Sequence, residues 1–263
     1  MRRERAPVTA GARGVRIRRV VTTRAGGVST GPYARFNLSV GVGDDAAAVA
    51  ANRRRLATAL GVRAVVFLEQ VHGTRVATIE EPPAPGAPDV PETDAAVTAL
   101  PGVGLAVLAA DCVPVLLGDP QAGVVGAAHA GRAGAAGGII PAVLDAMIAL
   151  GARTDRVEVL LGPAICGACY EVPAQLRAEV AAALPGSASR TRRGTPGLDL
   201  RAGLYRQLVD LGVARIGVDP RCTMEDPDLY SYRRDGRTGR IAGVIWLDPT
   251  DDATITTPGQ SDR

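Results

Sequence analysis

Apolar residues along this chain fall into short runs separated by polar or glycine-rich segments. Three runs follow one another at residues 105–110, 114–117 and 124–128. Each run is too short for a helix, so together they predict neighbouring buried strands. The other runs that predict strands are residues 17–22, 64–68, 75–79, 157–161, a segment near Ile216, and 241–247.

Helical patterns lie between these runs. Residues 45–60 are rich in alanine, Asp44 or Asp45 can cap their first turn, and Gly61 ends them. Residues 137–150 place apolar side chains at helical spacing and so have one face for a core. Two more predicted helices are 173–184, which starts at a proline, and 199–211, which ends before a glycine. Helices that alternate with strands predict one mixed α/β domain.

The segments between these elements also have distinct patterns. Residues 69–73 lie between two of the apolar runs, which predicts two strands that meet at a tight turn with His72 at a strand end. Segment 24–33 is rich in glycine and predicts irregular structure. The proline-rich segment 81–88 and the polar segment 231–235 predict surface loops.

The two ends of the chain differ from its body. Seven arginines and one glutamate lie in residues 1–19. We predict a disordered basic end at 1–15, one domain over 16–248 and a disordered tail at 249–263. No apolar segment follows the arginines as in a secretory signal, and no run of about 18 apolar residues predicts a membrane span. We therefore expect a cytoplasmic protein that has no membrane partner.

The composition restricts the chemistry that is possible. All 30 positively charged residues are arginines, and His72 and His129 are the two histidines. The absence of lysine excludes Schiff-base chemistry and a phosphate loop ending in Gly-Lys-Ser/Thr. Beyond residue 19 the chain has 23 arginines against 26 acids, and aromatic residues make up 3% of the whole. A nucleic-acid binder normally has a basic face with aromatics for stacking, so we expect no nucleic-acid partner.

Both histidines and one cysteine lie at predicted strand ends, beside glycine or aspartate. Imidazole nitrogen and thiolate sulfur are preferred zinc ligands, and three protein ligands leave a fourth position for water in catalytic sites. His72, Cys112 and His129 are therefore candidate metal ligands. Two other interpretations remain: the three residues are structural, or Cys112 is a nucleophile paired with a histidine.

Further candidates have weaker patterns. Arg24 and Arg132 lie beside glycine-rich turns, where guanidinium and backbone N–H groups suit phosphate or carboxylate. Cys166 and Cys169 form a Cys-x-x-Cys pair, but no second pair completes a zinc ribbon. Four cysteines in a chain without an export signal are more typical of reduced thiols than of a disulfide framework. We interpret this pair as small, partly buried thiols.

Six motifs together resemble the laccase-domain family, whose members have been called multicopper polyphenol oxidases and, later, purine nucleoside phosphorylases. The resemblance covers roughly residues 17–247. The motifs, in order, are Thr23–Ser29 (TRAGGVS), Gln70–Gly73 (QVHG), Ala110–Leu117 (ADCVPVLL), His129–Gly131 (HAG), Gly162–Ile165 (GPAI) with Cys169–Val172 (CYEV), and Ser231–Asp235 (SYRRD) with Thr238–Arg240 (TGR).

The resemblance implies a fold and a metal centre. The fold is a single-domain four-layer α/β/β/α sandwich with mixed sheets, similar to the catalytic domain of cytotoxic necrotizing factor toxins. The metal ligands map onto His72, Cys112 and His129, with zinc as the usual ion and copper as the alternative. A cluster of copper centres needs many imidazoles, and two histidines cannot supply them.

The resemblance also implies a reaction. It is phosphorolysis of adenosine, inosine, guanosine and 5′-methylthioadenosine, with adenosine deamination through a zinc-activated water as a second activity. The expected partners are purine nucleosides and phosphate, bound by a monomer or homodimer. Asp111 is a candidate for proton transfer or for orienting a histidine ligand. Candidate substrate or phosphate contacts are Arg24, Ser29, Gln70, Arg132 and Glu171.

One departure from the family pattern concerns the third motif with histidine. The family usually reads His-Ala-Gly-Trp-Arg-Gly, whereas here Arg132 and Ala133 follow Gly131. Either Arg132 replaces the family arginine or that contact is lost, and the tryptophan surface that could stack on a base is missing. Three alternatives therefore stay open: an amide hydrolase using Cys112 and His129 on a peptidoglycan precursor, a copper-dependent polyphenol oxidase, and a nucleotide-binding module without turnover.

Overall fold

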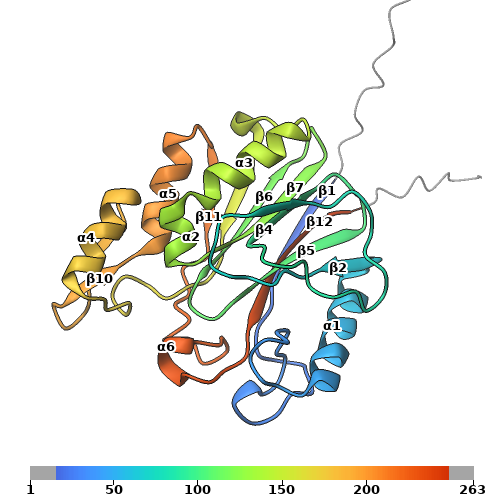
Figure 1. Ribbon diagram of the computed structural model, residues 1–263, viewed down its shortest axis with the longest axis horizontal. Helices are drawn as coiled ribbons and strands as arrows, with labels where there is room; N and C mark the ends of the chain where they lie inside the picture. The colour runs from blue at the N-terminus through green and yellow to red at the C-terminus, as the bar shows by residue number, and fades with distance from the viewer. Residues whose placement is uncertain (1–15, 249–263) are drawn as a thin grey trace, which may run out of the picture.

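The computed structural model describes residues 16–248, and the predicted disordered ends at 1–15 and 249–263 lie outside the described residues. Two β-sheets pack face to face, and helices cover their outer surfaces (Figure 1). The prediction of one mixed α/β domain is confirmed. The likeness to the toxin catalytic domain stays a prediction.

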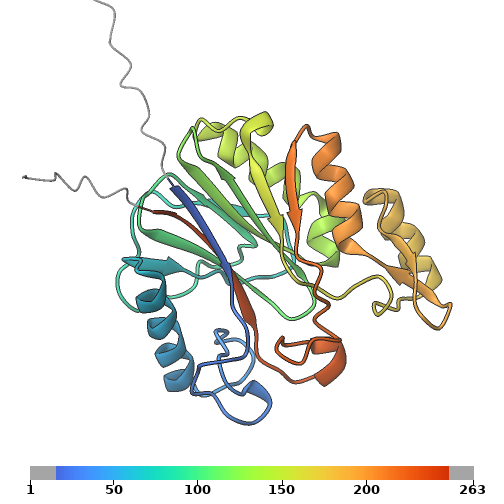
Figure 2. The same ribbon diagram turned by 180° about the vertical axis from the view of Figure 1, so that it is seen from behind.

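The first sheet has the strand order β1-β12-β5-β2. Its strands are β1 (Arg16–Val21), β2 (Ala64–Val66), β5 (Val103–Ala109) and β12 (Ile241–Asp248). The second sheet has the order β11-β8-β6-β7-β4-β3. Its strands are β3 (Val76–Thr78), β4 (Ala95–Thr98), β6 (Val113–Asp119), β7 (Val124–Ala130), β8 (Glu158–Leu161) and β11 (Arg215–Val218). A small antiparallel pair, β9 (Ala188–Arg190) and β10 (Pro196–Leu198), lies beside helix α4 at one end of the molecule (Figure 2).

Helix α1 (Ala46–Leu60) covers the outer face of the first sheet, and α2 (Arg132–Gly137), α3 (Ile139–Ala149) and α5 (Leu200–Asp210) lie on the outer face of the second. The remaining helices are α4 (Ala174–Ala183) and α6 (Tyr232–Asp235), with short 3₁₀ turns at Gly31–Tyr33 and Thr154–Arg156. The predicted caps of α1 are confirmed. The Asp45 carboxylate accepts hydrogen bonds from the amides of Ala47 and Ala48, and Gly61 ends the helix with a φ of 65°.

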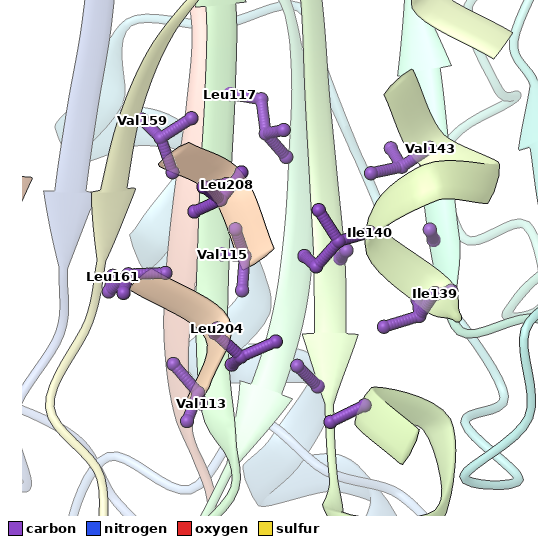
Figure 3. Packing of buried hydrophobic residues seen from close by; sticks show 14 of the residues in the cluster. Val113, Val115, Leu117, Ile139, Ile140, Val143, Val159, Leu161, Leu204 and Leu208 are labelled. Carbon is purple, nitrogen blue, oxygen red and sulfur yellow. The ribbon is translucent and has the colours of Figure 1, made fainter. Parts of the chain in front are cut away.

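The strands of the second sheet are buried on both faces. Along β6, Leu116 faces the first sheet, whereas Val113, Val115 and Leu117 face the helices (Figure 3). Ile140 of α3 and Leu204 of α5 pack against this outer face. Burial on both sides explains why the strands read as continuous apolar runs instead of alternating ones.

Two sequence predictions were wrong. β2 and β3 do not meet at a tight turn, because β2 pairs in parallel with β5 in the first sheet and β3 pairs in parallel with β4 in the second. The segment with His72 therefore crosses between the sheets. The polar segment 231–235 contains the short helix α6, whose first turn is capped when the amide of Arg234 donates to the Ser231 hydroxyl. Neither partner strand nor cap is visible in the local apolar pattern.

None of the helices in the described part of the chain has both the length and the apolar character needed to cross a membrane.

Candidate metal centre and its pocket

Three segments that are distant in sequence bring the predicted metal ligands together. His72 lies on the crossing between the sheets, Cys112 on the turn between β5 and β6, and His129 near the end of β7. Sγ of Cys112 lies 3.8 Å from Nε2 of His72. One ligand atom from each residue lies within 4.8 Å of the others. The sequence prediction that these residues form one group is consistent with this arrangement.

This donor set fits a metal ion. Tetrahedral ligands at zinc bond lengths lie about 3.3–3.8 Å from each other, so small side-chain movements would suffice for binding. One thiolate and two imidazoles are ligands that zinc accepts, and a fourth position would stay open toward the pocket. The structure therefore supports a metal site here, while the choice between zinc and copper is not decided by the geometry.

Asp94 is buried directly behind the ligands. Nδ1 of His129 donates to its carboxylate at 2.8 Å, which leaves Nε2 of that ring free to face a metal. The same carboxylate accepts hydrogen bonds from the backbone amides of Val71, His72 and Gly73, at 3.1, 3.0 and 2.7 Å. One side chain thus orients one ligand and holds the loop that contains another. Sequence reasoning missed Asp94, although a carboxylate directly before a buried strand was a usable signal.

The hydrogen bonds at this centre shift the pKa of several groups. Burial alone would raise the pKa of Asp94, but the hydrogen bonds from His129 and the backbone amides outweigh it and lower the pKa. Burial also opposes ionisation of Cys112, yet the neighbouring His129 and His72 lower the pKa of its thiol to about 6. The thiolate is the form that binds metal or acts as a nucleophile. The surroundings therefore favour the reactive form of Cys112.

The backbone at two of these positions lies in the left-handed region. His72 has a φ of 61° and Asp111 a φ of 101°. Such conformations cost about 1–3 kcal/mol in residues other than glycine and persist where the surroundings hold them. Asp94 holds the His72 loop. At Asp111, the carboxylate accepts hydrogen bonds from the Thr223 hydroxyl and from the Arg233 amide, both at 2.6 Å.

Gly131 allows the three ligands to approach one another. A Cβ atom at this position would lie 2.5 Å from Cδ2 of His72 and 3.2 Å from Sγ of Cys112. Contact at 2.5 Å is not tolerated by real Cβ atoms, so a larger residue would displace the ligands. The glycine after His129 therefore has a specific packing role.

The metal ligands line a groove of about 1600 Å³ that extends along α1 and the proline-rich loop. Ligand pockets usually measure about 300–1,000 Å³, so a ligand at the centre would fill only part of this groove. Beside the ligands it is lined by Arg132, Tyr170, Tyr232, Arg233 and Arg240.

The arginines and tyrosines of this pocket are paired. The Arg233 guanidinium lies 5.0 Å from the centre of the Tyr170 ring, and that of Arg240 lies 6.0 Å from the centre of the Tyr232 ring. The conclusion that a stacking surface is missing was wrong, because the two tyrosines provide aromatic rings in the pocket. Tyr232 is 62% exposed, and burial lowers the pKa of Arg240. Helix α6 and the loop after β8 bring these residues in, which the linear sequence does not show.

The predicted substrate contacts are divided by the structure. Gln70 and Arg132 line the pocket. The amide of Gln70 donates to the carbonyl of Leu108 at 2.8 Å and accepts from its N–H at 2.7 Å, so it links the His72 crossing to β5.

Three other predicted contacts lie outside the pocket lining. Arg24 stacks on Tyr230, at 4.8 Å from the ring centre. Ser29 is buried and accepts a hydrogen bond from Asn52. The carboxylate of Glu171 pairs with Arg193 at 3.0 Å.

The family model described as multi-copper polyphenol oxidoreductase laccase matches residues 18–248. The chain belongs to this family. Its two histidines, both in the one centre, contrast with the multicopper part of that description.

Relatives and solved structures agree over nearly the whole chain. A Mycobacterium tuberculosis protein named purine nucleoside phosphorylase is 56% identical over 236 residues, covering 89% of this chain and 93% of the relative. A Deinococcus radiodurans protein of the same name is 50% identical, covering 86% and 87%. The Neisseria meningitidis protein NMB0706 has a TM-score of 0.80 at 36% identity, covering 88% and 94%. YlmD from Geobacillus stearothermophilus has a TM-score of 0.79 at 36% identity, covering 92% and 94%.

Proposed function

We propose that this protein is a metal-dependent purine nucleoside phosphorylase. The observation that supports this function best is the meeting of three metal-ligand side chains, three arginines and two tyrosines in one pocket. The names of the relatives at 50–56% identity agree with it. The proposed substrates are adenosine, inosine, guanosine and 5′-methylthioadenosine together with phosphate.

The arginines bind the anionic reactant in this proposal. Arg132, Arg233 and Arg240 present guanidinium groups beside the candidate metal ligands, and guanidinium pairs with phosphate through charge-assisted hydrogen bonds. Arg132 then replaces the family arginine that is absent at position 133. Asp111 holds the backbone of Arg233 and so positions this residue, because both of its carboxylate oxygens already accept hydrogen bonds.

The tyrosines bind the base. Tyr170 and Tyr232 offer aromatic faces on which a purine can stack, and ring stacking contributes about 0.5–1.5 kcal/mol beyond the area buried. The exposed ring of Tyr232 is accessible to a nucleoside that enters from solvent.

We propose zinc as the metal, with His72, Cys112 and His129 as its ligands. When bound, the ion supplies Lewis-acid stabilisation of negative charge in the pocket and can lower the pKa of a coordinated water, which would support adenosine deamination as a second activity. Asp94 orients His129 so that its Nε2 faces the pocket, and Gly131 leaves room for the ligands to approach. The protein thus provides orientation, anion binding and base stacking around the centre.

The decisive assay measures base release from inosine, adenosine and methylthioadenosine with and without phosphate. The proposal expects release that requires phosphate and is lost when a chelator removes the metal. Arg132→Ala should raise the KM for phosphate at least tenfold. Arg206→Ala is the matched control, since Arg206 is an exposed arginine of α5 and pairs with Asp210 on the same helix. Base release that is equally fast without phosphate would contradict the proposal.

One observation favours a second candidate, an amide hydrolase that uses Cys112 and His129. The pKa of Cys112 is lowered and that of His129 is raised to about 9, as in a thiolate–imidazolium pair; for His129, burial opposes the shift and the Cys112 and Asp94 charges outweigh it. The two candidates compete for the same atoms. An active protein that has no metal and is inactivated by alkylation of Cys112 would favour the hydrolase.

A further inference from the structure

A second group of metal-ligating side chains shares no residue with the first centre. It consists of Cys166, Cys169, Cys222 and Glu225, and we call it the cysteine cluster. One ligand atom from each of the four residues lies within 4.8 Å of the others. All three cysteines are free thiols. In the sequence the Cys-x-x-Cys pair lacked a second pair, and the fold supplies the two missing side chains from a segment more than fifty residues away.

The cluster is built from two tight turns. In the first, the amide of Cys169 donates to the carbonyl of Cys166 at 2.9 Å. In the second, the amide of Glu225 donates to the carbonyl of Cys222 at 3.1 Å. Each turn therefore presents two candidate ligands three residues apart, and this spacing is common among structural zinc sites.

Backbone contacts hold the two turns against each other. Ala164 and Cys222 form a parallel bridge, and the amide of Thr223 donates to the carbonyl of Ala164 at 3.2 Å. The amide of Cys166 donates to Sγ of Cys222 at 3.4 Å. An N–H group that points at sulfur stabilises a thiolate, so the backbone favours the metal-binding form of this side chain.

We propose that the cysteine cluster binds a structural zinc ion through three thiolates and the Glu225 carboxylate. Four protein ligands close the coordination sphere, which is the arrangement of structural and not catalytic zinc sites. Cys222 is buried, Cys166 and Cys169 are partly buried, and Glu225 is exposed, so the ion lies just below the surface.

The charge of such a site is balanced by a neighbouring arginine. Three thiolates and one carboxylate bring four negative charges, and zinc offsets two of them. Arg192 lies against the cluster: its Nη1 is 3.7 Å from Sγ of Cys169 and also pairs with the Glu225 carboxylate. A carboxylate has two oxygens, so Glu225 can bind zinc with one and keep Arg192 on the other.

The cluster also braces the catalytic pocket. Thr223, which follows Cys222, donates its hydroxyl to Asp111 beside the metal ligand Cys112. Tyr170, which follows Cys169, lines the pocket. A zinc ion at the cluster would therefore fix the positions of two segments that shape the site.

The test isolates the cluster by removing the first centre. The variant His72→Ala/Cys112→Ala, purified with a reductant, should retain about one zinc ion per chain by elemental analysis, against about two in the unchanged protein. Cobalt added to the zinc-free variant should give a strong thiolate-to-cobalt charge-transfer band. In the same background, Cys166→Ser/Cys169→Ser should lose the ion and the band.

Glu225→Ala covers the case in which the double serine variant fails to fold. Glu225 is exposed, so its loss leaves the core intact, and zinc affinity should fall about tenfold or more in competition with a chromophoric chelator. Glu179→Ala, an exposed glutamate on α4, is the matched control and should leave affinity unchanged. The proposal is overturned if the isolated cluster binds no zinc, if it holds iron with acid-labile sulfide, or if Glu225→Ala and Glu179→Ala bind zinc equally.

Discussion

Asp94 accepts a hydrogen bond from Nδ1 of His129 at 2.8 Å, and both side chains are almost fully buried. Because an ionised carboxylate can only accept hydrogen bonds, the proton must lie on Nδ1, and Nε2 is the atom available to a metal. The same carboxylate receives the amides of the loop that contains His72. Asp94 thus couples the orientation of one candidate ligand to the backbone position of another.

Asp94→Asn should weaken metal binding. An asparagine amide keeps the size of the side chain but loses the charge and presents a donor where acceptors are needed. Removing such an outer partner typically reduces metal affinity by about 10- to 100-fold. Zinc titration with a chromophoric chelator measures the change. Asp155→Asn, an exposed carboxylate paired with Arg153, is the matched control and should bind zinc as the unchanged protein does.

Asp94 should also give the metal-free protein a specific pH dependence. Its pKa in the folded chain lies below the ordinary 3.8, so its ionisation stabilises the folded state above about pH 4 and this contribution is lost as the pH falls through the folded pKa. At pH 6, Asp94→Asn should lower the free energy of unfolding by about 2 kcal/mol. His129, the charged partner, stays protonated over this range because its pKa is raised to about 9. Urea unfolding between pH 6 and pH 3 should show the difference narrowing; a constant difference would rule out this role.

Gly131→Ala should disrupt the metal centre without unfolding the domain. The added methyl group overlaps the ring of His72 and crowds Cys112, so the ligands must separate. We expect roughly a 10- to 100-fold loss of metal affinity, corresponding to the cost of overpacking. Gly41→Ala is the control, because nothing lies within 4 Å of a Cβ atom there. Equal zinc affinity for the two variants would show that Gly131 has no such role.

Tyr232→Ala should impair nucleoside binding more than phosphate binding. The variant loses the exposed aromatic face, so the KM for inosine should rise about tenfold, which corresponds to a loss of about 1.4 kcal/mol. Tyr232→Phe keeps the ring and should retain the original KM. If both variants raise the KM equally, the hydroxyl group and not the ring face contributes to binding. Tyr205→Ala, an exposed tyrosine of α5, controls for nonspecific effects.

Local sequence was sufficient for several features. The caps of α1, Asp45 and Gly61, follow from short-range hydrogen bonding and backbone freedom, which a few neighbouring residues determine. The candidate metal ligands could be named because the chain has only two histidines, so any imidazole site had to use them. Residue chemistry and scarcity were enough to identify the ligands, without knowledge of their geometry.

Tertiary structure decided what depends on partners distant in sequence. Strand pairing is long-range, so β2 and β3 could not be assigned to separate sheets from their own apolar residues. Asp94 and the pocket tyrosines acquire their roles only when separate segments meet at the edges of these sheets. The same holds for the cysteine cluster, where folding places Cys222 and Glu225 beside a Cys-x-x-Cys pair that had no partner in the linear sequence. Sequence determined which chemical groups are present, and the fold determined which of them share a site, because contacts between distant segments are set by packing.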